Sequence, residues 1–138
     1  DTIIPICEKI ALEENIEFLL IENIAHKDAI KIKSECDIFI DQIHNRGGWG
    51  YGMNSIEALS MGLCCLTELN NKYIKFIPDH PFVNVDERSL YEKLKQLINY
   101  PEKIIEYKKR GRYWVEKKHD LNNVAEKLYQ YYNEKNWT

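Results

Sequence analysis

The sequence predicts an α/β fold: a parallel sheet in a three-layer sandwich, with helices on both faces and a helical C-terminal end. Two observations predict this class. Short apolar runs rich in Ile and Phe, without strict alternation, are typical of strands buried on both faces, as in parallel sheets. Segments with a helical spacing of apolar residues separate these runs, and right-handed crossovers fold such a series into three layers.

The elements follow in order along the chain. A helix is predicted for residues 1–15, where Pro5 is tolerated in the first turn, and another for "HKDAIKIKSE". Four strands are predicted, in "IEFLLIEN", "CDIFIDQI", "LCCLTEL" and "FVNV". A helix should begin near Asn54, between the second and third of these strands. From residue 87 onward the spacing predicts three helices, interrupted at Pro101 and ending near 135.

Composition and charge fit one compact domain. The 138 residues, 44% of them hydrophobic, are enough to bury a core. A net charge of -3 offers no general reason to expect a nucleic-acid partner. Residues 101–118 hold seven Lys or Arg against three acids, a pattern that favours a solvated helix surface over contact with an anionic or membrane surface.

The cysteines and histidines do not follow metal-site patterns. The four cysteines form no C-x-x-C pair and predict small buried side chains in a reducing compartment. His26 precedes a predicted helix and indicates a cap or a surface side chain, whereas "HD" at 119–120 indicates a turn with Asp120 as the helix cap. We therefore expect no metal and no cofactor.

The location of the protein is predicted from the absence of targeting signals. No segment approaches the roughly 18 apolar residues that span a bilayer, and no signal peptide opens the chain. We expect a cytoplasmic protein, with a peripheral position at the inner face of the membrane as the alternative. Because the chain starts at Asp1 within a predicted helix, we also expect a fragment of something larger.

The stretch "GGWGYGMNSIEALSMG" at 47–62 concentrates glycines between a predicted strand and a predicted helix. In open α/β sheets, ligands bind beyond the carboxyl ends of the strands. Glycines leave backbone N–H groups accessible, and the positive end of the helix dipole adds to their attraction for phosphate. The spacing is neither G-x-G-x-x-G nor a P-loop, so a tight turn that needs glycine is the alternative.

Two interpretations are available for Glu57. Asn54 is a good N-cap, and Glu57 three residues later completes a capping box. A carboxylate would repel a neighbouring phosphate, so a functional Glu57 should face a neutral group such as a ribose hydroxyl.

The segment 37–68, "DIFIDQIHNRGGWGYGMNSIEALSMGLCCLTE", resembles the nucleotide-sugar-binding signature of GT-B glycosyltransferases grouped as family 4. That signature reads E-G-F-G-L-P-x-x-E-A-M-A-C-G-x-P-V-I. The matching residues are Gly50, Tyr51, Gly52, Met53, Glu57, Ala58, Leu59 and Gly62, and Leu63 to Leu66 stand where the next strand begins. The weaker resemblance over about 15–135 implies that residues 1–138 are one C-terminal, Rossmann-like donor domain, without its first strand and without the N-terminal acceptor domain.

The resemblance also implies an activity and a donor site. The reaction would transfer a sugar, with retention, from a nucleotide diphosphate sugar to a hydroxyl of a glycan, lipid or small molecule, without a metal. Glu57 would bind the donor ribose, and the backbone of Gly50, Tyr51, Gly52 and Met53 would bind the diphosphate. No catalytic residue is assigned.

One position departs from the family. Its first glutamate, which contacts the donor sugar, is Trp49 here. An indole cannot replace those hydrogen bonds, although it can stack on a sugar face. The polar contact would come from Gln42, His44 or Asn45, or activity would be weakened.

Other family groups are missing from the chain. The Arg/Lys pair that contacts the phosphates is not visible, and Lys27 and Arg46 are poor substitutes by position. We therefore expect the chain alone to be inactive in transfer. A nucleotide-sugar 2-epimerase of GT-B fold and a non-catalytic nucleotide-binding module are the alternatives.

Overall fold

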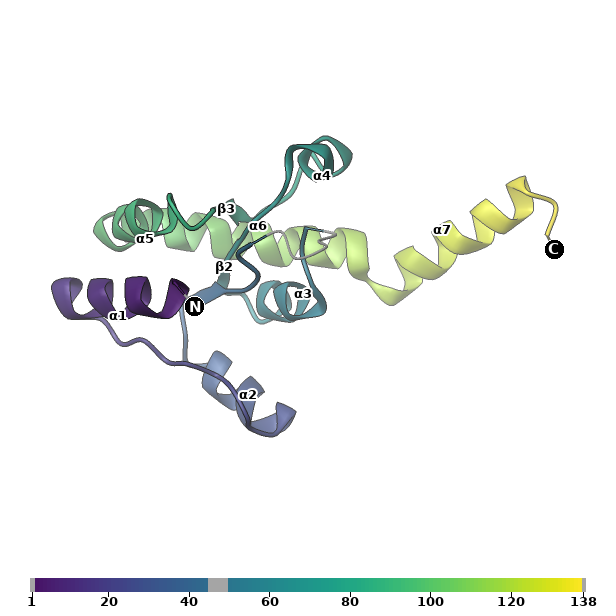
Figure 1. Ribbon diagram of the computed structural model, residues 1–138. Coiled ribbons are helices and arrows are strands. Elements are labelled where there is room, and N and C mark those ends of the chain that lie inside the picture. Colours follow the sequence, from purple (N-terminus) through teal and green to yellow (C-terminus); the bar gives the residue numbers. More distant parts are fainter. Residues whose placement is uncertain (1, 45–49, 138) are drawn as a thin grey trace.

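The computed structural model describes residues 2–44 and 50–137, which form seven helices and a three-stranded sheet (Figure 1). The strands are β1 (Ile38–Ile40), β2 (Cys64–Thr67) and β3 (Val83–Asn84). The helices are α1 (Ile3–Glu14), α2 (His26–Lys33), α3 (Met53–Ser60), α4 (Asn71–Phe76), α5 (Leu90–Asn99), α6 (Pro101–His119) and α7 (Leu121–Glu134).

The sheet is parallel, with the order β1-β2-β3. Ile38 pairs with Cys64, and Leu66 pairs with Val83. α3 lies in the connection from β1 to β2, and α4 lies in the connection from β2 to β3. All four residues of the central strand β2 are buried, which explains why its sequence shows no polar alternation. The predicted α/β class and three of the four predicted strands are confirmed.

The predicted strand at "IEFLLIEN" is wrong. Residues 16–23 form an irregular connection between α1 and α2. Ile16, Leu19 and Leu20 are exposed there, whereas Phe18 packs against the core, so the run lies along the surface with one side chain in contact with the core. An apolar run predicts burial, but a strand also needs a neighbouring strand with which to pair its backbone groups.

α4 was not predicted. It begins after Asn70, whose side chain accepts a hydrogen bond from the Tyr73 amide at 2.8 Å.

The core consists of two clusters that meet at β2. Cys64 and Leu66 belong to the cluster that contains α1 and α5 residues, whereas Cys65 belongs to the cluster that contains α3 and α6 residues. This division follows from the two-residue period of a strand, which directs successive side chains to opposite faces.

Three of the four cysteines, Cys7, Cys64 and Cys65, are buried as the sequence predicts. Burial raises the pKa of Cys64 and of Cys65 to about 12 and that of Cys7 to about 11, and Cys36 is half-buried. Because the thiolate is the reactive form, we expect the native chain to react slowly with a thiol reagent, and only at Cys36. The reaction should reach four thiols per chain in denaturant.

A Cys36→Ser variant provides the control for this measurement, because it should show almost no native reaction. Rapid native reaction of two or more thiols would contradict the buried positions of Cys7, Cys64 and Cys65.

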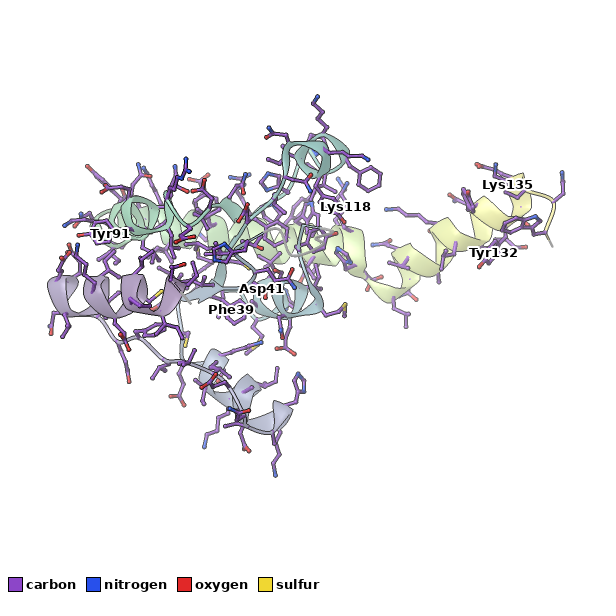
Figure 2. All side chains as sticks on the ribbon, in the orientation of Figure 1. Phe39, Asp41, Tyr91, Lys118, Tyr132 and Lys135 are labelled. Atoms are coloured by element: carbon purple, nitrogen blue, oxygen red, sulfur yellow. The ribbon has the colours of Figure 1, made fainter. Side chains whose placement is uncertain are left out.

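The C-terminal helices differ in their contacts. α6 packs against α3 and β2, whereas α7 extends away from the body of the molecule and has no buried residue (Figure 1). Tyr132 and Lys135 of α7 project outward, far from the sheet (Figure 2). Asp120 caps α7 as predicted, accepting hydrogen bonds from the amides of Asn122 and Asn123.

The basic stretch of α6 lies on a solvated surface. Lys108 pairs with Asp37 at 2.9 Å, and Lys118 pairs with Asp79 at 2.9 Å. Within the described ranges, no helix combines the length and the apolar character needed to cross a membrane.

Candidate functional site

Polar residues gather where the strands end, at the carboxyl edge of the sheet. Asp41 and Gln42 follow β1, and Glu68 follows β2. The Glu68 amide donates a hydrogen bond to the Gln42 carbonyl at 2.8 Å, so the two strand ends stay together. This edge is where ligands bind in open parallel sheets.

The described part of the glycine segment is attached to this edge. The buried Thr67 hydroxyl, at the end of β2, lies 3.1 Å from the Gln42 carbonyl oxygen and 3.5 Å from that of Gly50. Gln42, Gly50 and Gly52 therefore lie together: a Cβ at Gly52 would meet Gln42 Nε2 at 3.2 Å.

Gly50 is required by the local structure. Its φ is +92°, a conformation that L side chains rarely adopt. An added Cβ would lie 2.5 Å from Tyr73 Cδ1 and 3.0 Å from Leu69 Cδ2. The alternative interpretation of the glycine segment, a tight turn, therefore accounts for Gly50 without a ligand.

The Tyr51 side chain anchors the loop in the core. Its ring stacks on Phe82 at 5.0 Å and meets Trp114 edge-on at 5.7 Å between centroids. Its hydroxyl lies 3.3 Å from His119 Nε2, and burial raises the pKa of Tyr51. These contacts engage the ring, which stays partly exposed. The sequence did not reveal this anchoring role.

The N-terminus of α3 supplies free amides. The helix begins at Met53 after Gly52, and the first backbone bond runs from the Ile56 amide to the Gly52 carbonyl at 3.3 Å. Among the residues that the structure describes, the amides of Met53, Asn54 and Ser55 have no acceptor. Unpaired N–H groups at the positive end of a helix dipole form a site that favours anions.

The predicted capping box is wrong. Because α3 begins before Asn54, that residue lies inside the first turn, and its Oδ1 accepts a hydrogen bond from Lys33 Nζ at 3.3 Å. Glu57 turns toward α2 as well: Oε1 accepts from Lys33 Nζ at 2.6 Å, and Oε2 lies 2.6 Å from His26 Nε2. His26 is on the surface as predicted, but it contacts Glu57 and caps nothing, since Ala25 is the N-cap residue of α2.

Lys33 is buried, with 4% of its surface exposed. Its ammonium contacts Glu57 and Asn54 and lies 4.5 Å from the centre of the Phe39 ring. Phe39 on β1 and Asp41 just beyond it lie beside α3 in Figure 2. An ammonium at this depth needs such partners, because burying an unpaired charge is costly.

Glu57 is ionised and retains capacity for further donors. Partial burial raises the pKa of Glu57, but hydrogen bonds from Lys33 and His26 outweigh this effect and hold the pKa below its usual value. Each carboxylate oxygen has one described partner, whereas an ionised carboxylate offers about four acceptor positions. Since 23% of the side chain is exposed, hydroxyl donors can reach those positions.

Other polar groups complete the edge. Ser55 Oγ donates to Asp41 Oδ2 at 2.5 Å, which fixes α3 to the end of β1. His44 does not join Glu57; its amide donates to Glu68 Oε2 at 2.7 Å, and its Nδ1 lies 3.8 Å from Glu87 Oε2.

Some predicted residues lie outside the described ones: Trp49, Asn45 and Arg46. The sequence analysis did not identify Lys33 or Asp41 as part of the site. One signal was available for Lys33, because it follows His26 by seven positions and therefore shares a helix face with it.

Within residues 2–44 and 50–137, no cluster of three or more His, Cys, Asp or Glu side chains could hold a metal ion.

Together these residues define the kind of protein this is. It is an α/β protein in which the unpaired amides of α3 and the ionised Glu57 carboxylate lie beside a parallel sheet. No family model matches the chain, and no significant match was found among curated proteins or solved structures.

Proposed function

We propose that this chain is the donor-binding part of a GT-B glycosyltransferase resembling family 4. The observation that carries the proposal is the placement of the signature residues in space. The backbone of 50–53 leads along the carboxyl edge of the sheet into free amides of α3, and Glu57 follows one turn later with an ionised carboxylate.

The diphosphate of the donor would lie against the amides at the start of α3. Backbone N–H groups and the helix dipole attract its charge, and fixed donors of this kind stabilise a leaving diphosphate during transfer. Tyr51 supports this role because its ring packs against Phe82 and Trp114 and so fixes the adjoining backbone.

The donor ribose would bind Glu57. Its hydroxyls are neutral donors, so they suit a carboxylate on which Lys33 and His26 already occupy one position on each oxygen.

The division of the core supports a Rossmann-like, three-layer arrangement. Successive side chains of β2 enter two clusters, one with residues of α1 and α5 and the other with residues of α3 and α6. Helices on both faces of the sheet would produce this division.

The remaining parts of the activity rest on the resemblance. Transfer would occur with retention and without a metal, to an acceptor held by an N-terminal GT-B domain of the same protein. At the position of the family's first glutamate this chain has Trp49, so the contact to the donor sugar would come from stacking on Trp49 or from Gln42, His44 or Asn45.

Calorimetry with UDP, GDP and ADP tests the donor site. We expect at least one of the three to bind the chain, and we expect Glu57→Gln to weaken that binding about tenfold or more, because a hydrogen bond to a charged group is lost. Gln preserves the shape of the side chain and an acceptor for Lys33.

Glu22→Gln removes an exposed carboxylate from the connection between α1 and α2 and should leave the affinity unchanged. A folded sample that binds none of the three nucleotides would overturn the proposed function of this chain.

A further inference from the structure

We infer that Lys33 is a positioning residue of the proposed donor site, which holds the Glu57 carboxylate so that its free acceptor positions meet the ribose hydroxyls. Lys33 would thereby set the preference of the site for ribose over a sugar that lacks these hydroxyls. The inference rests on the proposed function and adds a specificity-determining residue to it.

Lys33 itself is too deeply placed to touch a nucleotide. Its side chain is 5% exposed, and its ammonium is surrounded by Glu57, Asn54 and the Phe39 ring. Any effect of Lys33 on a ligand must therefore pass through these neighbours, of which Glu57 is the one that is accessible and ionised.

Two side-chain nitrogens hold Glu57, one on each oxygen. Lys33 Nζ lies 2.6 Å from Oε1, and His26 Nε2 lies 2.6 Å from Oε2. Two contacts at separate oxygens define the plane of the carboxylate, whereas a single contact would leave rotation about the last side-chain bond. A fixed plane directs the remaining lone pairs in fixed directions, which is what selective recognition of two adjacent hydroxyls requires.

Lys33 also compensates the charge of Glu57. The proposed diphosphate site extends to Met53, one helical turn before Glu57, so an uncompensated carboxylate at Glu57 would repel the ligand. On the elements around α3, His26 lies on α2, Asp41 after β1 accepts from Ser55, and Arg112 on α6 binds the Ser60 carbonyl. Within the described part of the chain, only His26 and Lys33 contact the Glu57 carboxylate.

Stability alone is a weak reason for this arrangement. Replacing a whole buried ion pair by apolar side chains is often neutral or stabilising, so a buried ion pair is weak evidence of a stabilising role. The neighbouring lysines of α2, Lys27 and Lys31, are exposed, so the helix does not need a buried lysine for solubility.

The test compares UDP, GDP and ADP with their 2′,3′-dideoxy counterparts by calorimetry. The chains are wild type, Lys33→Met, Glu57→Gln, the double variant, and Lys31→Met as the matched control on the exposed face of α2. We expect wild type and Lys31→Met to prefer the ribonucleotide roughly ten- to hundredfold. Lys33→Met and Glu57→Gln should each lose most of this preference. Glu57→Gln should change dideoxynucleotide affinity less than about threefold, whereas Lys33→Met should weaken dideoxynucleotide binding by a smaller factor than ribonucleotide binding, because the charge of Glu57 is then less compensated.

The double variant identifies the path of the effect. If Lys33 acts through Glu57, then Lys33→Met in the Glu57→Gln background should cause no further loss of ribose preference. His26→Gln alters an exposed position, and it should lower the preference partially without disturbing the fold, as checked by circular dichroism.

Three results would overturn the inference while leaving the proposed function in place: an unchanged ribose preference in Lys33→Met, an equal loss of affinity for both sugars in a folded variant, or additive losses in the double variant. A wild-type chain that binds diphosphates without ribose preference would also overturn it, and would leave only the diphosphate half of the proposed function. Absence of all nucleotide binding would overturn both.

Discussion

Glu57→Ala should lower the free energy of unfolding by about 2–4 kcal/mol, because it leaves the buried Lys33 ammonium without its carboxylate. The Asn54 carbonyl oxygen and the Phe39 ring remain as partners, so the loss should be somewhat smaller than for a fully orphaned charge. Urea unfolding at neutral pH measures this difference, provided that the slope with denaturant is unchanged.

Lys33→Met should cost less than Glu57→Ala. It leaves the partly exposed Glu57 carboxylate in reach of water and of His26, and it places an unbranched apolar side chain against Phe39. We expect the free energy of unfolding to fall by about 1 kcal/mol or less. The double variant Lys33→Met/Glu57→Ala should have a free energy of unfolding close to that of Lys33→Met.

An exposed glutamate provides the control for both variants. Glu22→Ala should change stability by less than about 0.5 kcal/mol, as surface substitutions usually do. Equal costs for Glu57→Ala and Lys33→Met, or a double variant less stable than both, would contradict the described burial of Lys33.

Gly50→Ala should lower the free energy of unfolding by about 2–4 kcal/mol, the sum of a backbone and a packing cost. The backbone has a φ of +92°, and the new Cβ would lie 2.5 Å from the Tyr73 ring. Because Tyr73 packs edge-on against Tyr51, with centroids 5.9 Å apart, it cannot move without disturbing the anchor of the loop.

Gly62→Ala separates the two costs. Its φ is +77°, but a Cβ there would meet nothing within 4 Å, so we expect a loss of about 1–2 kcal/mol from the backbone alone. Equal losses at Gly50 and Gly62, measured by the same urea titration, would show that Tyr73 yields to the added methyl group.

The Gly50→Ala variant also distinguishes the two interpretations of this glycine, a tight turn and a phosphate-binding backbone. A large loss of stability in the absence of nucleotide means that packing against Tyr73 is sufficient to require glycine at this position. Phosphate binding is then better tested at the amides of α3 and at Glu57.

Most of the fold followed from local patterns. Periodicity and composition predicted three strands, their parallel arrangement and most helix positions, because a buried strand and an amphipathic helix each leave a pattern within a few residues. The run "IEFLLIEN" failed because its pattern contains no information about whether another strand lies beside it.

The candidate site could be predicted only in part. The glycine segment and Glu57 stand close together in the sequence, so their shared position before and within one helix was predictable. Asn54 and Glu57 were expected to bond to each other as a capping box, but contacts with α2 replaced that local arrangement.

The sequence by itself determined the α/β class, the parallel strands and the glycine loop that leads into α3, since each depends on neighbouring residues. Only the tertiary structure decided which groups hold Glu57, because Lys33 and His26 are 24 and 31 residues away from it along the chain. It also decided why Gly50 must be glycine, since Tyr73 approaches it through packing of α4 against the loop. Such contacts depend on how elements meet, and no local pattern encodes that.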